Sequence, residues 1–105
     1  MLSRTYAAVI AVAAGTAFSW TSIALAQDYK ARAWAASCAG CHGTNGRGGD
    51  EIPAIAGRSK ADLVTVLKEF KADKRKTATI MHQHAKGYTD EQLERIAEYF
   101  SQQKR

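Results

Sequence analysis

Apolar residues recur at helical spacing in two segments of the chain. Each segment places four of them on one helical face, namely Leu63, Val64, Leu67 and Phe70, and then Leu93, Ile96, Ala97 and Phe100. Ser59 with Asp62, and Thr89 with Gln92, have the three-residue spacing of N-terminal capping boxes. The pattern therefore predicts two amphipathic helices, one beginning after Ser59 and one after Thr89.

The rest of the chain also favours helices and loops. An alanine-rich stretch from Tyr29 to Gly40 predicts a helix that ends near Cys38, where glycines permit a tight turn. A glycine-rich loop is expected from Gly43 to Gly57, and one short helical turn between Thr77 and Gly87. No segment alternates apolar and polar residues as a strand does. The predicted fold class is all-α, with three main helices joined by loops.

The first quarter of the chain has the pattern of an export signal. Arg4 precedes an apolar stretch from Ala7 to Ala17, and Ala24-Leu25-Ala26 places small residues where a signal peptidase cuts. A membrane anchor is the alternative, but the stretch is alanine-rich and contains hydroxyl side chains, which weakens it as a span. We expect residues 1–26 to be a cleaved signal peptide and residues 27–105 to form one exported domain without a membrane span, periplasmic in a Gram-negative source.

The expected mature chain has few residues from which to build a core. Residues 27–105 contain only nine Ile, Leu and Val residues. Chains below roughly 80 residues seldom bury enough apolar surface without a disulfide, a metal or another covalent constraint. The composition therefore predicts that a cofactor or a cross-link completes the fold.

Cys38-Ala39-Gly40-Cys41-His42 is a C-x-x-C-H motif, the attachment signature of c-type haem. Two thiols at this spacing on a helical turn can each add to one vinyl group of the same porphyrin. The adjacent His42 can then offer Nε2 to the iron. The motif predicts that Cys38 and Cys41 hold the cofactor and that His42 binds the metal.

Other uses of these residues are a Cys38–Cys41 disulfide or dithiol, and a zinc site that adds two of the three histidines. A redox dithiol normally lies in a βαβ unit, and the chain shows no strands. His82-Gln83-His84 lacks the usual zinc-ligand spacing. A haem also brings the large apolar surface that the sparse core lacks, so we favour haem.

A sixth iron ligand must come from elsewhere in the chain. Met81 is the only methionine after Met1, and His82 and His84 are rival ligands beside it. A lone methionine is often a core filler, so the residues alone leave this choice open.

With these residues placed, the mature chain resembles the class I c-type cytochromes. The resemblance rests on four segments, Cys38 to Gly43, Ile52 to Gly57, Ala78 to Met81 and Lys86 to Leu93. Among small bacterial members it is most similar to the cytochrome subunit of flavocytochrome c sulfide dehydrogenase, and to carriers of the c553 or c554 kind. The resemblance implies a cytochrome c-like fold, with three main helices wrapped around one covalently attached haem.

The resemblance also implies roles for single residues. Met81 would be the sixth ligand, with His82 and His84 exposed. The carbonyl of Pro53 would accept a hydrogen bond from Nδ1 of His42, which orients the ring. Arg58 would pair with a haem propionate or remain a solvated surface residue. Three aromatic residues have packing roles: Tyr88 at the haem edge or in the core, and Tyr99 with Phe100 where the last helix crosses the first.

The implied function is electron transfer through a haem ligated by histidine and methionine, since a filled sixth site disfavours substrate binding at iron. The implied partners are an FAD-containing sulfide dehydrogenase subunit and a downstream electron acceptor. A free diffusible carrier is the alternative, followed by a haem enzyme or gas-binding module with an open sixth site. The single C-x-x-C-H permits one covalent haem, whereas some of these subunits have two.

Net charge changes the picture only locally. The whole chain has a formal charge of +5, which becomes +4 once Arg4 is removed with the signal peptide. Five basic residues gather before Met81, namely Lys68, Lys71, Lys74, Arg75 and Lys76. This basic cluster is either a solvated helix end or a surface that steers an acidic redox partner. Nucleic acid is not expected beyond an export signal, and Gly46 to Gly49 lacks the ending of a phosphate-binding loop.

Overall fold

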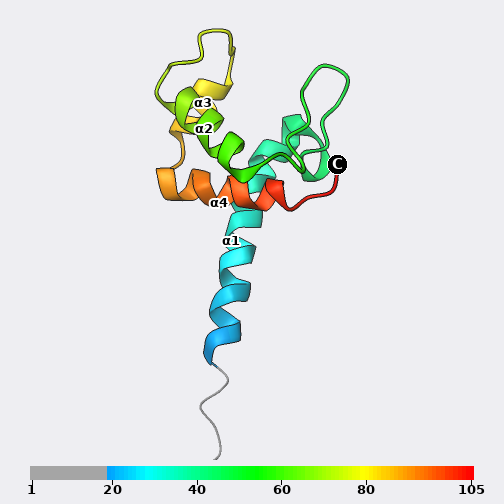
Figure 1. Ribbon diagram of the computed structural model, residues 1–105, viewed down its shortest axis with the longest axis vertical. Coiled ribbons are helices and arrows are strands. Elements are labelled where there is room, and N and C mark those ends of the chain that lie inside the picture. Colours follow the sequence, from blue (N-terminus) through cyan, green and yellow to red (C-terminus); the bar gives the residue numbers. More distant parts are fainter. Residues whose placement is uncertain (1–18) are drawn as a thin grey trace, which may run out of the picture.

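A computed structural model describes the backbone of residues 19–105 and the side chains from residue 29 onward. The predicted signal peptide, residues 1–26, and its cleavage site lie outside the residues whose side chains are described. Residues 19–105 contain helices and no strand (Figure 1): α1 (Ser19–His42), the 3-10 turn η1 (Thr44–Gly46), α2 (Lys60–Lys71), α3 (Met81–Lys86) and α4 (Asp90–Ser101). The predicted all-α class is confirmed. In this part of the chain, no helix is both long and apolar enough to cross a membrane.

Helix α1 extends beyond the end that the sequence predicts. It continues past Cys38 and Gly40 and ends at His42. A glycine inside a helix costs only about 1 kcal/mol relative to alanine, which does not stop a helix held by tertiary packing. The chain turns at Gly43, where φ is 82° and an added Cβ would lie 2.6 Å from the carbonyl oxygen of Gly48. The helix therefore ends where a positive φ is required.

Both predicted N-caps are present. The Ser59 hydroxyl accepts a hydrogen bond from the backbone N–H of Asp62 at 3.1 Å, at the start of α2. At the start of α4, Thr89 Oγ1 accepts from the backbone of Gln92 at 3.2 Å, and Gln92 Oε1 accepts from the backbone of Thr89 at 2.9 Å. The reciprocal pair satisfies two N–H groups that a helix start leaves without partners.

The core forms where α4 crosses α1 (Figure 1). Its buried members come from three helices: Ala35, Cys38, Leu63, Ile96, Ala97 and Phe100. Phe100 is 2% exposed and meets the Tyr99 ring edge-on at a centroid distance of 5.3 Å. The predicted packing of Tyr99 and Phe100 at this crossing is confirmed. The cluster is small, as the scarcity of large aliphatic residues requires.

Helices α2 and α4 are joined by a row of surface ion pairs, whose partners follow opposite orders along the two helices. The pairs are Lys60–Glu98 at 3.3 Å, Lys68–Glu94 at 2.7 Å and Lys71–Asp90 at 2.9 Å. The hydrogen bond to Glu94 raises the pKa of Lys68, and the hydrogen bond from Lys71 lowers the pKa of Asp90. Exposed pairs of this kind contribute roughly 0 to 1 kcal/mol each, so they orient the helices more than they stabilise them.

The same pairs alter the predicted basic cluster. Lys68, Lys71 and Arg75 each form an ion pair with a carboxylate. The partner of Arg75 is Glu69, at 2.6 Å. Within the described residues, only Lys74 and Lys76 of the cluster form no ion pair. The local positive charge is therefore largely compensated.

Candidate haem site

The end of α1 carries the two cysteines and the histidine of the C-x-x-C-H motif. Cys38 and His42 are four residues apart, so they lie on the same face of the helix, and Cys41 lies beside them. Cys38 is 8% exposed within the core cluster, whereas Cys41 is exposed to solvent. Neither forms a disulfide. One thiol is therefore seated against the protein and the other faces outward from the same turn.

Burial gives the two thiols different environments. Desolvation raises the pKa of the Cys38 thiol, partly offset by a weak contact at 4.0 Å with the Ser37 hydroxyl. Cys38 is therefore a protonated thiol at neutral pH in the absence of a cofactor, as expected for a buried cysteine.

His42 is buried and its ring is oriented by the following loop. Its Nδ1 lies 2.7 Å from the carbonyl oxygen of Pro53. Because a carbonyl can only accept, Nδ1 donates the proton of this hydrogen bond, which leaves Nε2 as the nitrogen that can bind a metal. The hydrogen bond that the family resemblance implied between these residues is confirmed. An imidazole held in this way is prepared to bind a metal through Nε2.

The loop after α1 folds back because its glycines adopt left-handed backbone conformations that most other residues disfavour. Gly46 has φ 75° and Gly48 has φ 83°. The carbonyl of Gly46 accepts hydrogen bonds from the backbone N–H groups of Ile55 and Ala56 at 2.8 and 2.9 Å. These bonds return the chain to the end of α1 and place Pro53 against His42.

Met81 lies on a different element, as the first residue of α3. It is half-buried, and the preceding Ile80 occupies the N-cap position without a side-chain hydrogen bond. Ile80 is 62% exposed and Ile52, in the loop that carries Pro53, is 38% exposed. Large aliphatic side chains are normally buried, so these residues offer apolar surface for a ligand to cover.

The structure links α3 to the motif through residues that the sequence analysis did not connect. Nε2 of His84, three residues after Met81, lies 3.4 Å from Oγ of Ser37, the neighbour of Cys38. The Tyr88 hydroxyl lies 2.5 Å from the same oxygen. His82 and His84 are both half-buried, so their expected exposure is wrong. Nothing in the sequence marks Ser37, because a serine before the motif gives no spacing signal.

The alternative uses of the cysteines find no support in the geometry. No group of three or more His, Cys, Asp and Glu side chains among the described residues is placed to hold a metal ion, which disfavours zinc. The thiols are free, and the described chain has no strand on which to build a redox dithiol unit. A haem fits better, because it needs two thiols and a histidine with a free Nε2, together with apolar side chains left uncovered.

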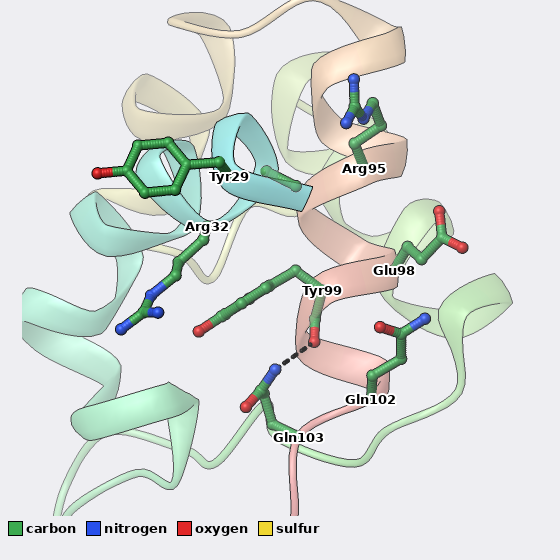
Figure 2. A pocket seen from close by; sticks show the side chains of 8 residues that line it. Tyr29, Arg32, Arg95, Glu98, Tyr99, Gln102 and Gln103 are labelled. Atoms are coloured by element: carbon green, nitrogen blue, oxygen red, sulfur yellow. Dashed lines mark hydrogen bonds between the residues drawn. The ribbon is translucent and has the colours of Figure 1, made fainter. Parts of the chain in front are cut away.

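The described pockets lie elsewhere, along the crossing of α1 and α4. The larger has a volume of about 390 Å³. Figure 2 shows Tyr29 and Arg32 of α1 facing Tyr99 and Gln103 across it, with Gln103 Nε2 donating to the carbonyl of Tyr99 at 3.0 Å. None of Cys38, Cys41, His42 and Met81 lines it. The candidate site thus lies outside both of these pockets.

Comparison with known proteins agrees with this geometry. The family model described as Cytochrome c matches residues 30–104, which include the motif, the loop, α3 and α4. The chain belongs to the cytochrome c family. The cofactor of this cytochrome c is a covalently bound haem c, and membership of the family supports a role in electron transfer.

Two relatives are similar over most of the described chain. This cytochrome is 53% identical over 64 residues to the cytochrome subunit of sulfide dehydrogenase of Chlorobaculum tepidum, an alignment that covers 61% of this chain and 57% of the relative. It is 37% identical over 70 residues to cytochrome c-554(548) of Halomonas halodenitrificans, covering 64% of this chain and 84% of that relative. The chain thus spans little more than half the length of the first relative and most of the second.

Proposed function

We propose that Cys38 and Cys41 would attach the haem covalently and that His42 and Met81 would bind its iron. The observation that carries this proposal is the 2.7 Å contact between Nδ1 of His42 and the Pro53 carbonyl, at the end of the helix that bears both cysteines. The contact fixes the tautomer that leaves Nε2 available. When bound, the haem supplies an iron that exchanges one electron between its ferric and ferrous forms.

The protein's part is to hold both ligands in place and to limit access of water. His42 is buried, and its hydrogen bond to a rigid proline carbonyl prevents ring rotation. Met81 supplies a thioether from α3, which raises the reduction potential and fills the sixth site. A site filled in both oxidation states suits electron transfer better than substrate binding.

A haem enzyme or gas-binding module is less well supported. Either would need a sixth site that is open, and an enzyme would also need an acid or base near it, for which the sequence offers His82 and His84. His84 instead contacts Ser37 and lies 6.1 Å from the Tyr88 ring. His82 remains the residue to exclude by experiment.

The ligand assignment is tested by the near-infrared absorption that a methionine sulfur bound to ferric iron produces. The wild-type holoprotein is expected to show this weak absorption and Met81→Ala to lose it. His82→Ala is the matched control, because it changes the next side chain on the same short helix and should leave the absorption in place. Absence of the absorption from the wild type would refute methionine ligation. Loss of the absorption only in His82→Ala would refute the assignment of the ligand to Met81.

For the physiological role, we propose electron acceptance from an FAD-containing sulfide dehydrogenase subunit in the periplasm, with delivery to a downstream acceptor. The similarity to the cytochrome subunit of sulfide dehydrogenase of Chlorobaculum tepidum supports this partner. A free carrier is the second candidate, favoured by the 84% coverage of the cytochrome c-554(548) relative. The exported domain would be residues 27–105, after cleavage of the signal peptide 1–26.

Two measurements separate these roles. Affinity purification of tagged protein from its native periplasm should recover a protein with bound FAD if it is a subunit, and haem protein alone if it is a carrier. Its N-terminal sequence should begin at Gln27. An uncut N-terminus would contradict the predicted cleavage without affecting the haem assignment.

A further inference from the structure

A hydroxyl cluster joins the end of α1 to α3 and to the connection before α4. Ser37 Oγ donates to the carbonyl oxygen of Trp34 at 2.9 Å. The same oxygen lies 2.5 Å from Tyr88 Oη and 3.4 Å from His84 Nε2. Ser37 directly precedes Cys38, and His84 follows Met81 by one helical turn. The cluster therefore connects the helix that bears the motif to the helix that bears Met81.

Proton counting allows all of these contacts to form together. A serine hydroxyl has one proton and can accept two hydrogen bonds. With its proton on the Trp34 carbonyl, Ser37 Oγ can accept from the Tyr88 hydroxyl and from His84 Nε2–H. The Tyr88 hydroxyl also lies 3.5 Å from the same Trp34 carbonyl. Ser37 Oγ thus contacts both a residue of α3 and a residue that follows it.

Helix α3 packs against α2 and buries Ala85, and its polar contacts add to this packing. It has six residues, and its N-cap residue Ile80 provides no side-chain hydrogen bond. Helices this short are not stable alone. Among the described side chains, the polar contacts from α3 to the rest of the chain are His84 to Ser37, and Lys86 to Asp73 in the preceding turn. Only the first of these reaches α1.

We infer that Ser37 is a positioning residue for the axial methionine, holding α3 and Tyr88 against the haem-bearing end of α1. This inference rests on the proposed function, because it takes Met81 as the sixth ligand. Removing the Ser37 hydroxyl removes the contact between His84 and α1 and leaves Tyr88 only the 3.5 Å contact with the Trp34 carbonyl, which favours the state in which α3 has moved away. Ser37 acts through Met81, and needs no contact with the iron.

Binding of imidazole to the ferric holoprotein measures this directly, because imidazole enters the sixth site only when methionine has left. Its apparent dissociation constant is the intrinsic constant divided by the fraction of open molecules. Ser37→Ala should lower that apparent constant roughly three- to tenfold, the factor equivalent to one net hydrogen bond. Ser37→Thr keeps a hydroxyl and should restore the wild-type value. Tyr88→Phe should act like Ser37→Ala without altering the residue beside Cys38.

Ser101→Ala is the matched control. Ser101 Oγ donates to the carbonyl of Glu98 at 2.7 Å, the same bond to the third preceding residue that Ser37 makes, but it joins no second helix. Imidazole binding by Ser101→Ala should equal that of the wild type. Unchanged imidazole binding in both Ser37→Ala and Tyr88→Phe, with the sulfur-to-iron absorption present in the wild type, would overturn the inference alone. Absence of that absorption from the wild type would overturn methionine ligation and, with it, this inference.

Discussion

The ammonium group of Lys86 lies 2.9 and 2.7 Å from the two carboxylate oxygens of Asp73. Asp73 has φ 56° in the turn that follows α2, and Lys86 is the last residue of α3. The ion pair therefore joins the two ends of the segment that carries Met81. Lys86 lowers the pKa of Asp73 through this hydrogen bond and its charge.

The Asp73–Lys86 pair predicts a loss of stability in acid. The pKa of the Asp73 carboxyl is lower in the folded state than in the unfolded state, where it is about 3.9. The ion pair therefore stabilises the fold fully above the unfolded-state pKa. This stabilisation is lost as the pH falls through the folded-state pKa. The thermal midpoint of the holoprotein should decrease as the pH is lowered below about 4, and Asp73→Asn should reduce this pH dependence. Asp50→Asn is the control, since Asp50 forms no ion pair with a described residue. An Asp73→Asn curve parallel to that of the wild type would contradict the prediction.

Phe100 is expected to be the most sensitive core position. It is 2% exposed at the crossing of α1 and α4, so Phe100→Ala should lower the free energy of unfolding by about 3 to 5 kcal/mol. That is a large part of the roughly 5 to 15 kcal/mol typical of a domain. Tyr29→Ala, at a side chain that is 75% exposed, should change it by less than about 0.5 kcal/mol. Guanidinium denaturation of the two holoproteins checks this, and equal losses would mean that the crossing is not the core.

Two glycines should respond to alanine in opposite directions. At Gly46, where φ is 75°, a Cβ would lie 2.7 Å from side-chain atoms of both Ile55 and Phe100. Gly46→Ala should therefore destabilise the fold by about 2 to 3 kcal/mol, through crowding and backbone strain. Gly40 lies inside α1 with no atom within 4 Å of the added Cβ, so Gly40→Ala should stabilise by about 0.5 to 1 kcal/mol. Thermal denaturation distinguishes the two signs, and stabilisation by Gly46→Ala would refute the close packing of this turn.

The capping box of α4 provides a local test. Thr89→Ala removes the acceptor for the Gln92 backbone and should cost about 1 kcal/mol. Thr65→Ala removes a hydroxyl that bonds only within α2, to the carbonyl of Ala61 at 2.9 Å, and should cost less than about 0.5 kcal/mol. Urea denaturation of both variants measures the difference. Equal costs would show that the cap contributes nothing beyond a surface hydroxyl.

The sequence predicts most of the helical framework, because the signals for it are local. Ser59 and Thr89 mark helix starts by their own side-chain chemistry, and the apolar spacing after them defines the buried faces. The end of α1 is less predictable. Gly40 and Gly43 look alike in the sequence, and only the return of the chain at Gly48 requires a positive φ at Gly43.

Some residues of the candidate site are likewise predictable from local sequence, and others meet only through contacts between distant parts of the chain. The C-x-x-C-H motif is contiguous, and the contact between His42 and Pro53 follows from the family resemblance. Ser37, His84 and Tyr88 meet through contacts spanning 47 and 51 residues, so no spacing rule brings them together. The compensation of the basic cluster is likewise invisible until α4 places Asp90 and Glu94 beside it.

Cys38 belongs to the same buried cluster as Ala35, Ile96 and Phe100. Attachment of the haem at Cys38, as proposed, would make the redox group covalently continuous with the most tightly packed part of the molecule, which deforms little. The atoms around the iron would then move little when its charge changes. The rate of electron exchange would depend mainly on how closely a partner approaches the haem, and only weakly on relaxation of the protein after each transfer.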